Sequence, residues 1–189
     1  MRTFAFIVLF AVFALPQTIV QRTFLLRAET TTADPYSGLS HVCVLVYPDG
    51  KYRLEKSAQS LGDRAPEVRV YLDQLPDASL KQMQAALDDP AFQDIETPER
   101  HGGIIQDMDI LSVTVPRVNA LQNLSFETAS QRKPYEKTLK PLINWMKDVE
   151  KRKVPVAKGE PSDNCRAPMV MYRRLSPLQP SGKNDSDTR

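Results

Sequence analysis

A β-rich apolar run, a Pro-Asp-Gly turn and a run of alternating polar and apolar residues follow one another between residues 41 and 55. The residues of Val42–Tyr47 offer apolar side chains to both faces, which is typical of a strand inside a sheet. After Pro48–Gly50, Tyr52 and Leu54 alternate with charged residues, so one face is covered and the other is at least partly exposed to water. The pattern predicts a β-hairpin with a three-residue connection.

Three later segments have the same β-like character. Apolar and polar residues alternate through Glu67–Asp73, which predicts a third strand. Ile110–Val115 and Gln122–Glu127 flank a connection that contains Pro116, and they predict a second hairpin.

Two segments have helical periodicity instead. Leu80, Met83 and Leu87 recur three and four residues apart, and Asp77 or Ser79 can cap a helix in front of them. The second helix is expected at about Leu139–Lys151, with Pro141 tolerated in its first turn because that position needs no N–H donor. Its apolar stripe, with Trp145 at the border, consists of Leu139, Leu142, Ile143, Met146 and Val149.

The element order β-β-β-α-β-β-α predicts an α+β domain over residues 41–153. We expect a mainly antiparallel sheet of five strands, because sequential hairpins favour antiparallel pairing. Both helices are expected on one face, because each has a single apolar stripe. Residues 29–40 are polar and turn-rich and predict a flexible lead-in, whereas residues 154–189 predict an extended segment and a disordered tail.

An unbroken apolar run of 12 residues, Phe4–Leu15, follows Arg2. One positive charge before a short apolar run is typical of a secretory signal, and we assign residues 1–28 to the signal peptide and leader. Cleavage is expected after Ala14 or soon afterwards, and export would place the protein in the periplasm or outside the cell. One alternative is an uncleaved N-terminal anchor, although the run is shorter than the roughly 20 residues that span a bilayer. The other is a buried N-terminal helix, which Arg2 and the polar and proline residues after the run argue against.

The order of these elements resembles small exported bacterial α+β domains of unknown function. The resemblance covers roughly His41–Lys151 and rests on three segments in sequence: Tyr47-Pro48-Asp49-Gly50-Lys51-Tyr52, then Leu75-Pro76-Asp77 with its helix, then a hairpin and a helix that opens with Leu139-Lys140-Pro141-Leu142. It implies a bacterial cell-envelope or secreted setting. It supplies no activity and no site residue.

Composition and motifs narrow the function classes. A formal charge of +2, with Lys and Arg scattered among 23 acidic residues, gives no basic stripe in the sequence that would favour nucleic acid. Phosphate-loop, dinucleotide and nucleophile-elbow patterns are missing from the sequence, and so is His-Glu-x-x-His. We therefore expect no cofactor and no metal, and membrane contact only through the N-terminal segment.

The nearest approach to a catalytic set is Glu99, His101, Asp107 and Asp109. Two carboxylates beside an imidazole could bind a divalent cation or act as acid and base, which would make the protein a small hydrolase or metal-dependent enzyme. The ordinary alternative is that these are solvated residues of a loop and a strand entrance, and we favour it because exposed acids are common in loops.

Four other features of the sequence could suggest binding sites, but each is explained more simply by its place in the fold. We expect His41 to be a partly buried, hydrogen-bonded histidine and Trp145, with Tyr135, to lie at the edge of the core. The basic segments Lys151–Lys153 and Arg173-Arg174 are expected to be a solvated helix end and tail, although they could contact anionic lipid or a partner.

Cys43 and Cys165 are the only two cysteines of the chain. In an oxidising compartment they most simply form one disulfide, and the alternative is a buried free thiol at Cys43. The leading functional hypothesis is a non-enzymatic exported module that binds an envelope protein or a cell-surface component. A membrane-tethered structural protein is the third hypothesis, and it requires an uncleaved N-terminus.

Overall fold

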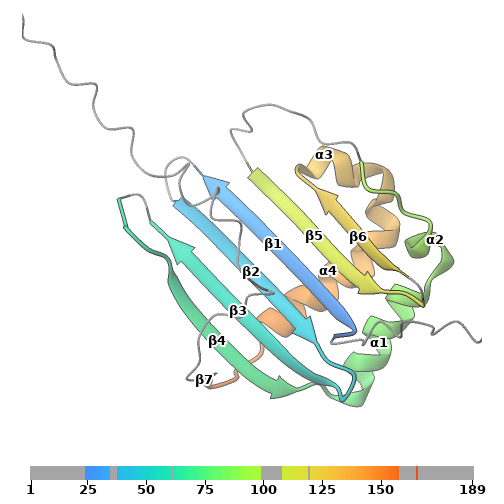
Figure 1. The fold of residues 1–189 in the computed structure, drawn as a ribbon, viewed down its shortest axis with the longest axis horizontal. Helices are drawn as coiled ribbons and strands as arrows, with labels where there is room; N and C mark the ends of the chain where they lie inside the picture. The colour runs from blue at the N-terminus through green and yellow to red at the C-terminus, as the bar shows by residue number, and fades with distance from the viewer. Residues whose placement is uncertain are drawn as a thin grey trace, which may run out of the picture.

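The computed structural model describes residues 24–34, 38–60, 62–98, 108–118, 120–157 and 165. They form an α+β fold with one antiparallel sheet in the strand order β6-β5-β1-β2-β3-β4-β7 (Figure 1). The strands are β1 (Leu26–Asp34), β2 (Gly38–Val46), β3 (Lys51–Gln59), β4 (Glu67–Gln74), β5 (Met108–Pro116), β6 (Leu121–Phe126) and β7 (Val156–Ala157). The helices are α1 (Asp77–Asp88), α2 (Pro90–Gln93), α3 (Ala129–Arg132), the 3-10 helix η1 (Lys133–Tyr135) and α4 (Glu136–Glu150).

The α+β class and the antiparallel sheet are confirmed, but the prediction of five strands was wrong because the sheet has seven. The first missed strand is β1, an interior strand of the sheet that pairs with β2 on one side and β5 on the other (Figure 1). It includes Glu29–Asp34, which the sequence predicted to be part of a flexible lead-in. Only Leu26 and Ala28 of β1 are fully buried apolar residues, so the strand has too little apolar pattern to stand out from a polar linker.

The second missed strand is β7. Val156 and Ala157 pair with Tyr71 and Val70 at the outer edge of β4. A pairing of two residues leaves no periodic pattern in the sequence, and the expected extended segment after residue 154 therefore includes a short edge strand. Of the predicted signal peptide and leader over residues 1–28, residues 1–23 lie outside the described residues, and Leu26–Ala28 belong to β1 and not to a leader. Most of the predicted segment and tail over 154–189, namely residues 158–164 and 166–189, also lies outside the described residues.

The hairpin around residues 48–50 forms as predicted. The N–H of Tyr47 donates to the carbonyl of Lys51 at 2.9 Å, and the N–H of Gly50 donates to the carbonyl of Tyr47 at 3.0 Å. Gly50 has a φ of +78°, and a Cβ at that position would lie 2.6 Å from Nε2 of Gln74. The turn therefore requires glycine for its conformation, whereas a Cβ would displace only the flexible end of the Gln74 side chain.

Helices α1 and α4 lie on one face of the sheet, behind it in Figure 1, and their apolar stripes build the main core against alternate residues of the strands. Trp145 lies in this core with 1% exposure. Its indole Nε1 donates to the carbonyl and the hydroxyl of Ser79, at 3.1 and 3.0 Å. Ser79 is thus used to join α1 to α4, and Pro76 occupies the N-cap position of α1 without a side-chain cap.

Candidate functional site

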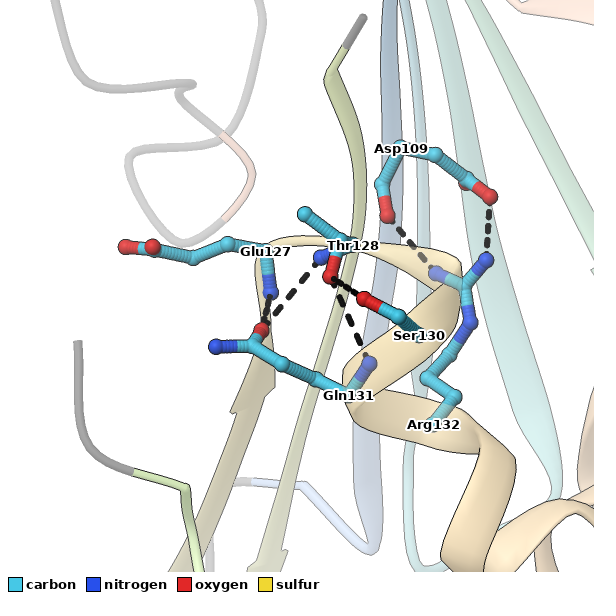
Figure 2. A network of polar contacts seen from close by, with 6 residues as sticks. All are labelled: Asp109, Glu127, Thr128, Ser130, Gln131 and Arg132. Atoms are coloured by element: carbon cyan, nitrogen blue, oxygen red, sulfur yellow. Dashed lines mark hydrogen bonds and ion pairs between the residues drawn. The ribbon is translucent and has the colours of Figure 1, made fainter. Parts of the chain in front are cut away.

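Of the predicted catalytic set, only Asp109 lies within the described residues; Glu99, His101 and Asp107 lie outside them. Asp109 is at the start of β5, and its carboxylate forms an ion pair with the guanidinium of Arg132 on α3. The same guanidinium donates to the backbone carbonyl of Asp109 at 2.7 Å (Figure 2). Arg132 thus binds both the carboxylate and the backbone carbonyl of Asp109, and this contact links α3 to the start of β5.

The polar network next to this pair is a helix start. The hydroxyl of Thr128 accepts from the N–H of Gln131 at 3.3 Å, and the side chain of Gln131 accepts in return from the N–H groups of Glu127 and Thr128 (Figure 2). This reciprocal capping box satisfies backbone donors that the short helix α3 leaves without partners. The network around Asp109 therefore has a structural explanation throughout.

A second group of polar residues lies on the sheet face opposite to α1 and α4, and we call that face the open face. Directly paired residues of neighbouring strands share a face, so Glu29, Cys43 and Glu55 form one row across β1, β2 and β3. In the next row, Arg27 and Arg53 flank Leu45 in the same way.

Each glutamate of this face has an arginine two residues earlier on its own strand. Nε of Arg27 lies 3.2 Å from Oε1 of Glu29, and Nε of Arg53 also forms an ion pair with Glu55. The side chain of Glu55 is only 4% exposed. The ion pair with Arg53 offsets part of the free-energy cost of removing this carboxylate from water.

The sequence contained a signal for these ion pairs. Arg27-Ala28-Glu29 and Arg53-Leu54-Glu55 have the same Arg-x-Glu pattern, and residues two apart on a strand point to one face. The sequence did not predict these ion pairs as neighbours, because the segment that forms β1 was expected to be a linker. Without β1, the two Arg-x-Glu segments could not be placed on the two strands that flank β2.

The row of glutamates contains the disulfide of Cys43 with Cys165, which confirms the predicted pairing. The bond joins residues separated by 122 positions. The chain leaves α4 on the helix side, pairs as β7 with the edge of β4, and is bonded at Cys165 to the open face. The C-terminal part of the fold is thus attached to the sheet on both of its faces.

His41 connects this disulfide to β1. Its Nδ1 lies 2.8 Å from the hydroxyl of Thr31, and its Nε2 lies 3.2 Å from the backbone carbonyl of Cys165. Because a carbonyl only accepts, Nε2 donates and Nδ1 accepts from Thr31. Both ring nitrogens are used within the fold, as expected for a buried, hydrogen-bonded histidine.

This arrangement predicts a pH dependence of stability. Burial lowers the pKa of His41 below its ordinary value of 6.5, while the hydrogen bond to Cys165 and the charge of Glu55 oppose the shift. The unfolded chain then binds a proton more readily, so the stability that His41 contributes is present above pH 6.5 and is lost as the pH falls towards the folded-state pKa. Urea unfolding at a series of pH values should show a shallower loss for His41→Gln than for the unmodified protein.

The titration of Glu29 changes the stability of the fold with pH in the opposite direction to that of His41, and it is the internal reference for this measurement. Burial raises its pKa above 4.5, with the charge of Arg27 opposing, so stability is gained as the pH falls through the folded-state pKa towards 4.5. Both proteins contain Glu29, and the difference between their profiles therefore isolates His41. Identical profiles would contradict the assignment.

A hollow lies at the end of the sheet where the β2–β3 turn meets β4. Its volume is about 580 Å³, within the range of ligand pockets, and its lining is mainly apolar. Leu72 on its wall is 50% exposed, although it is a large apolar side chain in the middle of a strand sequence. The other lining residues are Tyr47, Pro48, Asp49, Lys51, Tyr52, Asp73 and Gln74.

The outer edge of β4 beside this hollow could also pair with a further strand. Within the described part of the chain, β7 pairs with β4 only at Val70 and Tyr71, and no strand pairs with the outer edge of Leu72–Gln74. Pro155, which precedes β7 and would be the next residue to face Leu72, has no N–H to donate to the ladder. The hollow and the unpaired edge together form the best-defined candidate binding site, which we call the edge site.

Over the ranges that the structure describes, no three metal-ligating side chains gather in one place. None of the described helices is long and apolar enough to cross a bilayer. No protein-family model and no curated protein matches the chain.

Proposed function

We propose that this protein is an exported, non-enzymatic module that binds an extended segment of an envelope protein at the edge site. The observation that carries the proposal is the half-exposed Leu72 in an apolar hollow beside an unpaired strand edge. An extended peptide can add to such an edge through main-chain hydrogen bonds and place alternate side chains to one face. One apolar side chain of the peptide would fill the hollow and supply the selectivity.

Two observations support the proposal that the protein is exported to an oxidising compartment. The disulfide of Cys43 with Cys165 is of a kind that forms and persists in oxidising compartments. The N-terminal pattern of Arg2 and Phe4–Leu15 is typical of an export signal. An uncleaved anchor would keep the same module at the membrane and would leave the edge site unchanged.

A binding role is favoured over the enzymatic alternative because the polar side chains of Asp109 and His41 are engaged in contacts within the fold. Asp109 is held by Arg132, and both ring nitrogens of His41 are engaged. The edge site, by contrast, has a mainly apolar lining with Asp49, Lys51 and Asp73 among its residues, a composition that suits a peptide side chain better than a reaction.

The experiment is selection of peptides from a displayed random library, followed by titration of the selected peptides. We expect sequences with one apolar residue in an extended context. Leu72→Asp should weaken their binding by about tenfold or more, because burial of a leucine stabilises by about 1.5–3 kcal/mol. Unchanged affinity in this variant would refute the edge site.

The matched control is Val118→Asp. Val118 is 81% exposed and lies next to the start of β6, at the opposite edge of the sheet from β4. The same change in hydrophobicity and charge at this position should leave peptide binding unaltered. Equal losses in both variants would point to a general effect of the added aspartate and would count against the proposal.

A further inference from the structure

Although the basic residues are scattered along the sequence, the helical repeat of α4 gathers a stripe of lysines on its outer side, and the proposed peptide binding does not use it. Four of the lysines, from Lys137 to Lys151, recur at intervals of three, seven and four residues, which keeps them on one side of α4 and its C-cap. Lys133 precedes them in η1. The side chains at these positions are exposed, and the buried residues of α4, such as Leu142 and Val149, lie on the opposite side. The lysine stripe consists of Lys133, Lys137, Lys140, Lys147 and Lys151.

The charge of this stripe is not balanced locally. Residues 129–153 contain eight basic and three acidic residues, although the whole chain has a formal charge of only +2. Among the described residues, no ion pair includes a lysine of the stripe, whereas Arg132 is paired with Asp109 and Glu150 with Lys56. The excess positive charge of this region therefore faces solvent.

The character of the stripe indicates the chemistry of its partner. Over the described residues, the exposed large apolar side chains are Leu72, Val118, Leu121 and Val156, and none of them lies on α4. Protein interfaces usually have an apolar or aromatic centre, where lysine is depleted. Lysine, a point charge on a flexible stem, suits a flat layer of diffuse negative charge.

We propose that the outer side of α4 binds anionic lipid headgroups at a membrane surface. The part of the stripe from Lys137 to Lys151 runs for roughly 21 Å along α4 and its C-cap, so these four ammonium groups can reach one lipid surface at once. The open face, with its disulfide, then points away from the membrane, because α4 lies on the other face of the sheet (Figure 1). This proposal stands apart from peptide binding at the edge site.

The test is sedimentation of the protein, in the form that its cells accumulate, with vesicles that contain phosphatidylglycerol. Each basic residue near an anionic surface contributes about fivefold to the partition coefficient at low ionic strength. The variant K137Q/K140Q/K147Q should therefore bind roughly a hundredfold more weakly, and binding of the unmodified protein should fall steeply as salt is added. Circular dichroism checks that the variant is folded, which we expect because all three side chains are exposed.

The matched control removes three positive charges elsewhere, in K51Q/R64Q/R69Q, whose side chains are also exposed. A loss as large as that of the stripe variant would mean that only net charge matters and would overturn the proposal. It would also be overturned by binding to DNA or polyglutamate without binding to vesicles, or by no vesicle binding at all. The variant Leu72→Asp should bind vesicles normally, which separates this outcome from failure of the edge site.

Discussion

Reduction of the disulfide between Cys43 and Cys165 should lower the melting temperature by roughly 10 °C. A cross-link over 122 residues removes much of the conformational freedom of the unfolded chain, and the chain-entropy estimate is about 4–5 kcal/mol. Measured losses are usually somewhat smaller, and each kcal/mol corresponds to about 2–4 °C in a protein of this size. Calorimetry with and without a thiol reductant measures the difference directly.

The genetic counterpart is the double variant Cys43→Ala/Cys165→Ala. It should melt close to the reduced protein, and its melting temperature should not respond to reductant. Because the carbonyl of Cys165 accepts from His41, loss of the bond also releases one partner of that histidine. If the oxidised and reduced proteins melt together, the disulfide contributes nothing to the stability of this fold.

The second large effect is expected for Trp145→Ala, at about 3–5 kcal/mol of lost stability. Trp145 is among the largest fully buried side chains and contacts α1 through Ser79, so its removal leaves a cavity between the two helices and the sheet. Chemical denaturation gives the change in the free energy of unfolding.

Two variants test this explanation. Trp145→Phe keeps most of the apolar volume and loses the indole N–H, so we expect a smaller cost, of about 1–3 kcal/mol. Asn144→Ala, at the adjacent exposed position, should change stability by at most about 0.5 kcal/mol. A similar cost at Asn144 and Trp145 would contradict the cavity explanation, because alanine favours the helix at both positions.

Sequence patterns predicted the elements whose periodicity depends on a single buried face. The apolar stripe of the last helix placed α4, which begins three residues earlier and ends one residue earlier than the range Leu139–Lys151. The alternation in Glu67–Asp73 likewise identified β4. In α4, burial on one side and solvent on the other leave the period visible in the sequence. In β4 the alternation is visible in the residue types, although Val70 is its one buried residue and Leu72 is half-exposed.

The interior strand β1 could not be found in this way. Its residues on the open face include Arg27, Glu29 and Thr31, which are stabilised there by partners on β1, β2 and β5. Arg27, for example, donates to the hydroxyl of Thr114 on β5 at 3.1 Å, across 87 positions of sequence. A polar strand of this kind is specified by distant partners, and these are invisible in a local window.

The candidate site was the least predictable part. Asp109 attracted attention as a carboxylate near His101, but the residue that determines its role is Arg132, on a helix 23 positions away. The edge site depends on where β7 stops and on the shape of the β2–β3 turn, and neither is a property of residue type alone. The half-exposed Leu72 looked like an ordinary inward-facing residue of an alternating strand.

The interior position of β1 also sets the order in which the fold can be completed as the chain emerges. Strands β1 to β4 follow one another in sequence and pair as neighbours, so they can assemble as soon as residue 74 is available. The other edge of β1 stays open until β5 arrives at Met108, and α4 follows only after that. A chain that crosses a membrane from its N-terminus would therefore expose the β1 edge and the apolar face of a four-strand intermediate, which is the form that an export chaperone would have to protect.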